Sequence, residues 1–127
     1  MAPAIRPDPD GLLAAFARTV REKIAQDVER ERVAAEKARA GVARAAREAI
    51  GEARRRGLCG RAWLFGSFAW GQPGERSDVD VLVEAARDPD AVAALLGEAC
   101  GRDVHVLRRE TAPEALVARA LSEGEAL

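Results

Sequence analysis

Apolar residues recur every three or four positions along the first 57 residues of the chain. Large apolar side chains come first and smaller ones continue the stripe: Leu13, Phe16, Val20, Ile24, Val28, then Ala35, Ala38, Val42, Ala45 and Ala49. This spacing is typical of one apolar face of an α-helix. Gly41 and Gly51 are tolerated inside a helix but also end helices, so the pattern predicts one long helix or two in tandem over residues 10–57.

The ends of this helical region carry further signals. Residues 1–9 contain three prolines and predict an irregular leader, and Asp10 is a suitable N-cap. An unbroken helix over 10–57 would be about 70 Å long, more than the remaining residues can cover. We therefore expect part of the stripe to dock a partner protein or a second copy; the alternative is a partly solvated helix or coiled coil, for which the charged segment DVERERVAAEKAR is ordinary.

After Gly60 the pattern changes to short alternating elements. Apolar runs predict strands at 62–65, 79–83 and 104–107, PDAVAALLGEAC predicts a helix beginning near Pro89, and TAPEALVARALSEG predicts a closing helix. Strands that alternate with helices indicate an α/β (α+β) fold, a small mixed β-sheet backed by helices. We expect residues 58–127 to form one domain, with the N-terminal helix as an extension.

Charge and composition narrow the classes of partner. The 127 residues have a formal net charge of -1, with 12 Lys and Arg against 8 Asp and Glu in 10–57, and 7 against 12 in 58–127. Neither a strong overall field nor a membrane-spanning apolar run is present, so we expect no direct nucleic-acid binding and no membrane. The start MAPAIRPDPDG lacks the order of a secretory signal, which predicts a cytoplasmic protein with Cys59 and Cys100 as free thiols.

The segment LFGSFAWGQPGERSDVDVLVE contains the residues with the clearest chemistry. Gly66 and Ser67 follow a short strand, where glycine lets the backbone approach a ligand and serine offers a hydroxyl beside free N–H groups. Helix N-termini bind anions in this way, so the turn suits the phosphates of a nucleoside triphosphate. In the following loop, Arg76 either reaches a phosphate or is solvated.

Two carboxylates come ten residues after this turn. Asp78 and Asp80 stand one residue apart at the head of a predicted strand, so both side chains lie on one face. Paired carboxylates repel unless a cation lies between them, and their hard oxygens suit Mg²⁺ bridged to substrate phosphates. The pattern therefore predicts metal-assisted phosphoryl or nucleotidyl transfer.

With these residues, FGSFAWGQPGERSDVDVLV resembles the motif of the minimal nucleotidyltransferases of the polymerase-β-like superfamily: Gly-Ser, ten residues, then Asp-x-Asp. The resemblance covers about residues 58–127, including the closing PEALVARALSEGEAL. It implies the nucleotidyltransferase fold, Mg²⁺ and ATP. Many such proteins are antitoxins that transfer AMP from ATP onto a tyrosine of a HEPN ribonuclease toxin, so the resemblance also implies a HEPN-type toxin as partner.

The chain departs from the family pattern at two positions. Trp70 stands where the family usually has a basic residue, and it either packs or stacks on a base or a partner. His105 stands where the family commonly has a third carboxylate; imidazole is a poor Mg²⁺ ligand but a competent base near neutral pH. Asp103, two residues earlier, supplies the acid if the register shifts.

Three functions remain open at this stage. The first is an AMP-transferring antitoxin in which His105 or Asp103 assists the attacking hydroxyl. The second is a nucleotidyltransferase-fold antitoxin that has lost turnover and acts by binding alone, which the replacement of the acid by His105 favours. The third is a nucleotidyltransferase for a small molecule such as an aminoglycoside, with an acceptor pocket completed by a second subunit. The chain contains no tyrosine, which excludes tyrosine self-modification.

Overall fold

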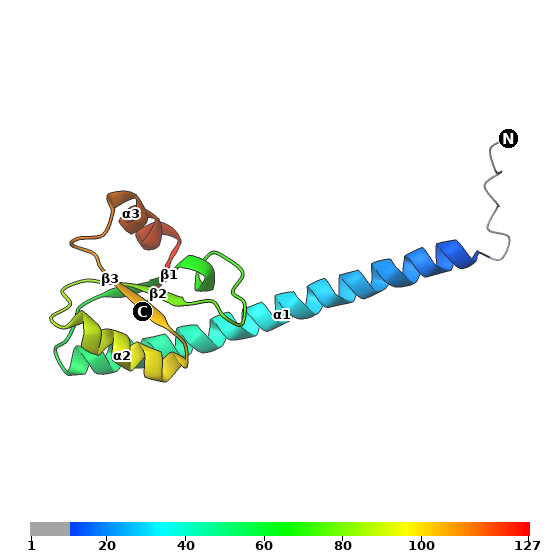
Figure 1. Cartoon of the computed structure of the whole chain (residues 1–127). Coiled ribbons are helices and arrows are strands. Elements are labelled where there is room, and N and C mark those ends of the chain that lie inside the picture. Colours follow the sequence, from blue (N-terminus) through cyan, green and yellow to red (C-terminus); the bar gives the residue numbers. More distant parts are fainter. Residues whose placement is uncertain (1–10) are drawn as a thin grey trace. The chain divides into compact units, whose positions relative to one another are not determined.

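The structure is a computed structural model, and it describes residues 11–127 of the chain. The expected irregular leader at 1–9 and the expected N-cap Asp10 lie outside the described residues. The elements follow the order drawn in Figure 1: α1 (Leu12–Arg55), β1 (Ala62–Phe65), η1 (Gly66–Phe68), β2 (Val79–Val83), α2 (Pro89–Cys100), β3 (Val104–Arg108), α3 (Glu114–Glu123) and β4 (Glu125–Ala126).

The N-terminal apolar pattern forms one helix, because α1 continues through both Gly41 and Gly51. The chain divides into two compact units after Ala34. In the described part of the first unit, helix residues 12–34 carry large apolar side chains that are 39–70% exposed: Leu12, Leu13, Phe16, Val20, Ile24, Val28 and Val33. Their burial therefore requires a surface outside the first unit.

The second unit uses the remainder of α1 as part of its core. Here the buried positions of the helix are mostly alanines: Ala35, Val42, Ala43, Ala46, Ala49, Ile50 and Ala53. Small side chains let the helix backbone approach closely, and those from Val42 onward join one core cluster with Val92 and Leu96 of α2. Leu64 and Val81 supply the sheet side of the same cluster.

The four strands form a mixed sheet in the order β3-β2-β1-β4. β1 runs antiparallel to β2 and β4, whereas β2 and β3 are parallel and are joined by α2. A parallel pair needs such a crossover, because a tight turn can join only antiparallel neighbours. The expected fold, a small mixed sheet backed by helices with a long N-terminal helix, is confirmed.

The other face of the sheet packs against α3, which Figure 1 draws on the side opposite α2. Trp63, Phe65 and Leu82 form a second core cluster with Ala120 of α3. The alternation along β2 explains the two clusters, since Val79, Val81 and Val83 face the first cluster while Leu82 faces the second. Asp80 shares the side of Leu82, so the sheet presents its carboxylate on the α3 side.

Local sequence signals explain where the helices begin and end. Asp88 caps α2 by accepting a hydrogen bond from the Ala91 amide at 3.1 Å, and Gly101 ends it in the left-handed conformation. Cys59 and Cys100 are free thiols, as expected, and burial raises the pKa of each. Over residues 11–127, no helix combines the length and apolar content needed to cross a bilayer.

Candidate active site

Gly66 brings the turn after β1 against the second carboxylate of the motif. Its φ is +74°, in the left-handed region that favours glycine, and a Cβ at this position would overlap the Asp80 carboxylate. The antiparallel pairing of Phe65 with Asp80 explains this proximity, because Gly66 directly follows Phe65 at the end of β1. Glycine at position 66 therefore keeps the carboxylate in place.

The turn itself differs from the expected helix N-terminus. η1 is a single 3₁₀ turn, and the Gly66 carbonyl accepts hydrogen bonds from the amides of Ala69 and Trp70, each at 3.0 Å. A helix of three residues has little macrodipole, so that part of the expectation was wrong. Gly71 then passes so close that a Cβ would lie 2.9 Å from the Ser67 Cα.

The two carboxylates converge on His105. Its Nε2 lies 3.7 Å from Oδ2 of Asp78, and its Nδ1 lies 3.4 Å from Oδ1 of Asp80. The parallel register pairs Asp80 with His105, which places both side chains on one face of the sheet. The structure thus brings together Gly66, Asp78, Asp80 and His105 at one edge of the sheet.

The electrostatics of the pair are uneven. The Asp80 side chain is 28% exposed against 44% for Asp78, and burial is the main cause that raises the pKa of Asp80. The neighbouring Asp78 raises this pKa further, whereas His105 opposes the shift by charge and hydrogen bonding. Burial and the neighbouring Asp78 therefore disfavour the ionised form of Asp80, and a bound cation would offset both effects.

Asp103 lies next to the site but is not in it. Val79 pairs with Val104, and the Asp103 carbonyl accepts a hydrogen bond from the Val79 amide at 2.9 Å. With this register, the position opposite Asp80 belongs to His105, so the register shift that would substitute Asp103 is absent. Asp103 instead lines an adjacent cleft.

This cleft has a volume of about 800 Å³ and opens beside Asp78. The loop before β2, the C-terminal half of α2 and the start of β3 line it: Glu75, Arg76, Ser77, Asp78, Ala94, Gly97, Glu98, Gly101, Arg102 and Asp103. Asp80, Gly66 and Ser67 lie outside its lining. The cleft therefore adjoins the carboxylate pair on the Asp78 side, and Arg76 faces it from the loop.

The donor set fits a metal that arrives with a nucleotide. Within residues 11–127, no three His, Cys, Asp or Glu side chains are placed to hold a metal ion by themselves. Mg²⁺ is usually held by one or two carboxylates together with substrate phosphates and water, so the Asp78 and Asp80 pair matches that coordination. His105 contributes a nitrogen, which is a poorer donor for Mg²⁺ than oxygen.

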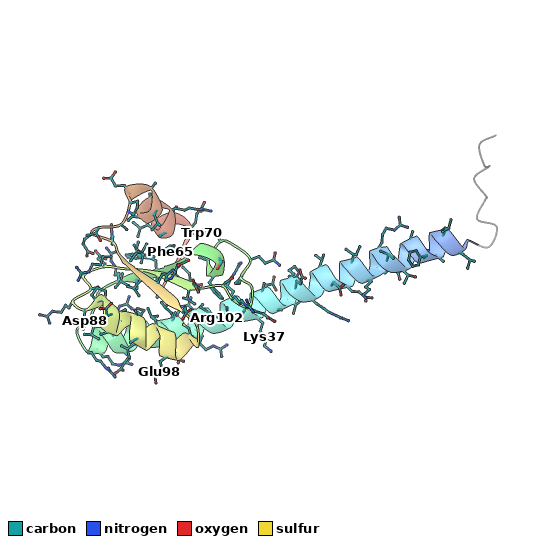
Figure 2. The ribbon with its side chains drawn as sticks, viewed as in Figure 1. Lys37, Phe65, Trp70, Asp88, Glu98 and Arg102 are labelled. Atoms are coloured by element: carbon teal, nitrogen blue, oxygen red, sulfur yellow. The ribbon has the colours of Figure 1, made fainter. Side chains whose placement is uncertain are left out.

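Trp70 packs rather than faces solvent. Its ring centroid lies 6.2 Å from that of Phe65, and Figure 2 labels both residues. The Arg119 guanidinium of α3 lies 4.1 Å from the centre of the Trp70 ring. The ring thus joins η1 to the sheet and to α3. Sequence reasoning missed Arg119 as its cover because the two residues are far apart along the chain.

Comparison with known proteins places this geometry. Residues 46–118 match the model of the nucleotidyltransferase domain family. A crystal structure of a toxin–antitoxin with AMP-PNP is 24% identical, has a TM-score of 0.51 and covers 62% of this chain and 69% of that chain. A crystal structure of a mutant toxin–antitoxin MntA-HpeT is 22% identical and has a TM-score of 0.53. The match covers 64% of this chain and 70% of that chain.

These two structural likenesses concern the fold, and no curated protein matches the chain. The family match shows family membership as well as fold, because it spans more than half of the chain. The matched residues include Gly66, Asp78, Asp80 and His105. The chain belongs to the nucleotidyltransferase domain family.

Proposed function

We propose that the protein is a Mg²⁺-dependent antitoxin that transfers AMP from ATP to a HEPN ribonuclease toxin and thereby neutralises it. The observation that carries the proposal is that the Asp78 and Asp80 carboxylates both lie against the His105 ring, with Gly66 against Asp80. Family membership supports nucleotidyl transfer, and the likeness to two toxin–antitoxin structures, one with AMP-PNP, supports the choice of nucleotide and partner.

In this mechanism Asp78 and Asp80 hold the ion, while Gly66 and Ser67 receive the outer phosphates of ATP. Bound Mg²⁺ neutralises charge on the phosphates and helps to orient the incoming hydroxyl. The hydroxyl oxygen of the acceptor attacks the α-phosphorus, the bond to pyrophosphate breaks, and the hydroxyl proton leaves to a base. Arg76, which faces the cleft from the loop, is positioned to contact a phosphate.

We assign the base role to His105. The His105 ring is 64% exposed and adjoins both carboxylates. It is therefore accessible to an acceptor hydroxyl that approaches the proposed ion site. Asp103 is the alternative, because it lines the cleft together with Asp78. Replacing each in turn distinguishes them: His105→Ala is expected to slow transfer of AMP, and Asp103→Asn to leave the rate unchanged.

The decisive experiment measures transfer of label from [α-³²P]ATP to the toxin encoded by the neighbouring gene. The wild-type chain is expected to label the toxin in the presence of Mg²⁺, and Asp80→Asn to lower the rate by about 100-fold or more, as expected for removal of a charge-stabilising group. Asp90→Asn, which replaces an exposed acid in the first turn of α2 outside the cleft lining, is the matched control. Labelling that is unaffected by Asp78→Asn and Asp80→Asn together would contradict the proposal.

A second candidate is an antitoxin that acts by binding alone. The position of His105 between both carboxylates favours it, because family members commonly have an acid there. Tight binding of the toxin without transfer of label supports this candidate. His105→Asp then restores the family pattern, and a gain of labelling in that variant would identify the imidazole as the cause of the lost turnover.

For toxin docking we propose the apolar stripe of the first unit, formed by Leu13, Phe16, Val20, Ile24 and Val28. At about 100° per residue, Arg21 flanks one side of the stripe and Lys23 the other, while Asp27 and Glu31 fall within its width, so charges of both signs border the apolar side chains. An apolar groove on the toxin with both charges at its rim would complement this face. A second copy of the helix is the alternative occupant, and the oligomeric state of the isolated chain tests it.

A further inference from the structure

Arg102 connects the two halves of the motif, although it belongs to neither. It follows α2 directly after Gly101, and its Nη1 lies 3.0 Å from the carbonyl oxygen of Gly74 and 3.1 Å from those of Glu75 and Ser77. Its guanidinium carbon also lies 4.9 Å from the centre of the Phe68 ring. Figure 2 labels Arg102. One side chain thus contacts the loop before β2 and the turn after β1.

The contact with Ser77 matters because Asp78 lies outside the regular strand. β2 begins at Val79, so Asp78 itself is not paired in the sheet. The carbonyl before it, that of Ser77, accepts from Arg102, and the amide after it, that of Val79, donates to the Asp103 carbonyl at 2.9 Å. Residues 102 and 103 therefore hold the backbone on both sides of Asp78.

The contact with Phe68 connects Arg102 to the Gly-Ser half of the motif. Phe68 is fully buried in the core and follows Gly66 and Ser67 in η1, so its ring is a rigid reference point. A planar guanidinium can stack on a ring while its N–H groups donate to several carbonyls. A lysine ammonium at the same place lacks that planar, multidentate geometry.

From this geometry we propose that Arg102 is a positioning residue, which sets the Asp78 carboxylate at its distance from the Gly66–Ser67 turn. Its importance for catalysis rests on the proposed function, but its effect on the backbone does not. Removing it leaves the loop carbonyls to water and the backbone before Asp78 without its anchor. The carboxylate pair then loses the arrangement in which both members reach one ion.

The first test is amide hydrogen exchange on the full chain without ligand. The amides of Gly74, Ser77 and Val79 are hydrogen bonded, to Ser77 Oγ, Gly74 O and Asp103 O respectively, and so report on the loop and on Asp78. Arg102→Ala is expected to speed their exchange at least about tenfold relative to the Val81 amide in the core strand. Arg108→Ala, which removes a single bond to the Ala86 carbonyl at 3.0 Å, is the matched control and is expected to leave them within about twofold.

The second test is binding of Mn²⁺ with a non-hydrolysable ATP analogue, followed by the manganese EPR signal. Misplacing a ligand through its supporting residues typically weakens metal binding by 10- to 100-fold, and we expect a loss of about this size for Arg102→Ala. Arg102→Lys keeps the charge and the fold but not the geometry, so it is expected to behave like Arg102→Ala. Arg108→Ala is expected to bind like the wild type.

The two readouts separate the inference from the proposed function. Wild-type exchange rates at Gly74, Ser77 and Val79 in Arg102→Ala would overturn the positioning role, as would full Mn²⁺–nucleotide affinity in both Arg102 variants. Failure of the wild-type chain itself to bind Mn²⁺ and nucleotide would instead overturn the proposed function. In that case the exchange rates alone decide the role of Arg102.

Discussion

The two parts of α1 reverse the usual relation between side-chain size and burial. Residues 12–34 carry a phenylalanine, two leucines, an isoleucine and several valines, and their large apolar side chains are exposed. From Ala35 onward the buried positions are mostly alanines. Alanine lets a helix pack closely on a sheet, whereas large side chains are suited to filling a partner's groove. The second part therefore serves the fold, and we propose that the first serves an interaction.

The largest expected effect tests the fold-serving part. Ile50 is fully buried in the core cluster shared with α2 and the sheet. Ile50→Ala is expected to lower the free energy of unfolding by about 2–5 kcal/mol, because it removes apolar contacts and leaves a cavity. Urea unfolding of the isolated chain measures the change. A loss below about 0.5 kcal/mol, typical of a surface site, would remove the distinction between the two parts.

A second substitution tests the role of small side chains directly. Ala46 is fully buried where α1 packs in the core. Ala46→Leu adds volume to a filled space, and it is expected to destabilise the protein by about 1–3 kcal/mol. Thermal unfolding compares it with Ala34→Leu in the exposed part, which is expected to be near neutral. Equal effects of the two leucines would contradict the close-packing explanation.

In the second unit, Asp80 is the expected exception to the rule that buried side chains stabilise the fold. Burial raises the pKa of Asp80, so its ionised form is less stable in the folded than in the unfolded chain. Asp80→Asn is therefore expected to stabilise the protein at neutral pH while lowering the transfer rate by about 100-fold or more. The gain is expected to vanish as the pH falls below the ordinary carboxyl pKa of about 4, where the unfolded wild type also becomes protonated.

Unfolding midpoints measured from pH 3 to pH 8 check this pH dependence. Glu75→Gln serves as the control, because the residue it replaces is an exposed loop acid. A midpoint for Asp80→Asn below that of the wild type at neutral pH would mean that His105 and the loop stabilise the ionised carboxylate more than burial destabilises it.

The smallest effect on stability is expected in the exposed part. Phe16→Ala and Ile24→Ala should change the unfolding free energy of the isolated chain by no more than about 0.5 kcal/mol. Each is nevertheless expected to weaken toxin binding by more than about 1 kcal/mol, as for central apolar anchors of an interface. Calorimetric titration with the toxin compares them with Gln26→Ala, a polar residue on the opposite side of the helix from the stripe. Unchanged affinity in both alanine variants would exclude this surface as the docking site.

The sequence predicted most of the secondary structure of this protein because its signals are local. Strand 62–65, strand 79–83 and the helix beginning at Pro89 have the expected bounds, since apolar runs and a capping Asp88 specify them. β4 was missed because two residues are too few to show a pattern. Whether the N-terminal stripe formed one helix or two depended on how Gly41 is tolerated, which the structure alone resolved.

The candidate site was predictable in part for a related reason. The Gly-Ser and Asp-x-Asp spacing indicates paired carboxylates, and the structure places Asp78 and Asp80 around His105. Arg102 was missed because an arginine after a helix resembles an ordinary solvated charge, and its three carbonyl partners are 25 to 28 residues away. The register that excludes Asp103 also depends on long-range strand pairing.

Position 66 has no room for a methyl group, which has a consequence for homologous sequences. Any homologue that carries a side chain there must displace the second carboxylate or twist the turn, while the apolar layers that hold the sheet together need not change. Under the proposed function, such a protein is expected to bind its partner but not to transfer AMP. The residue at position 66 would then distinguish active transferases from homologues that only bind.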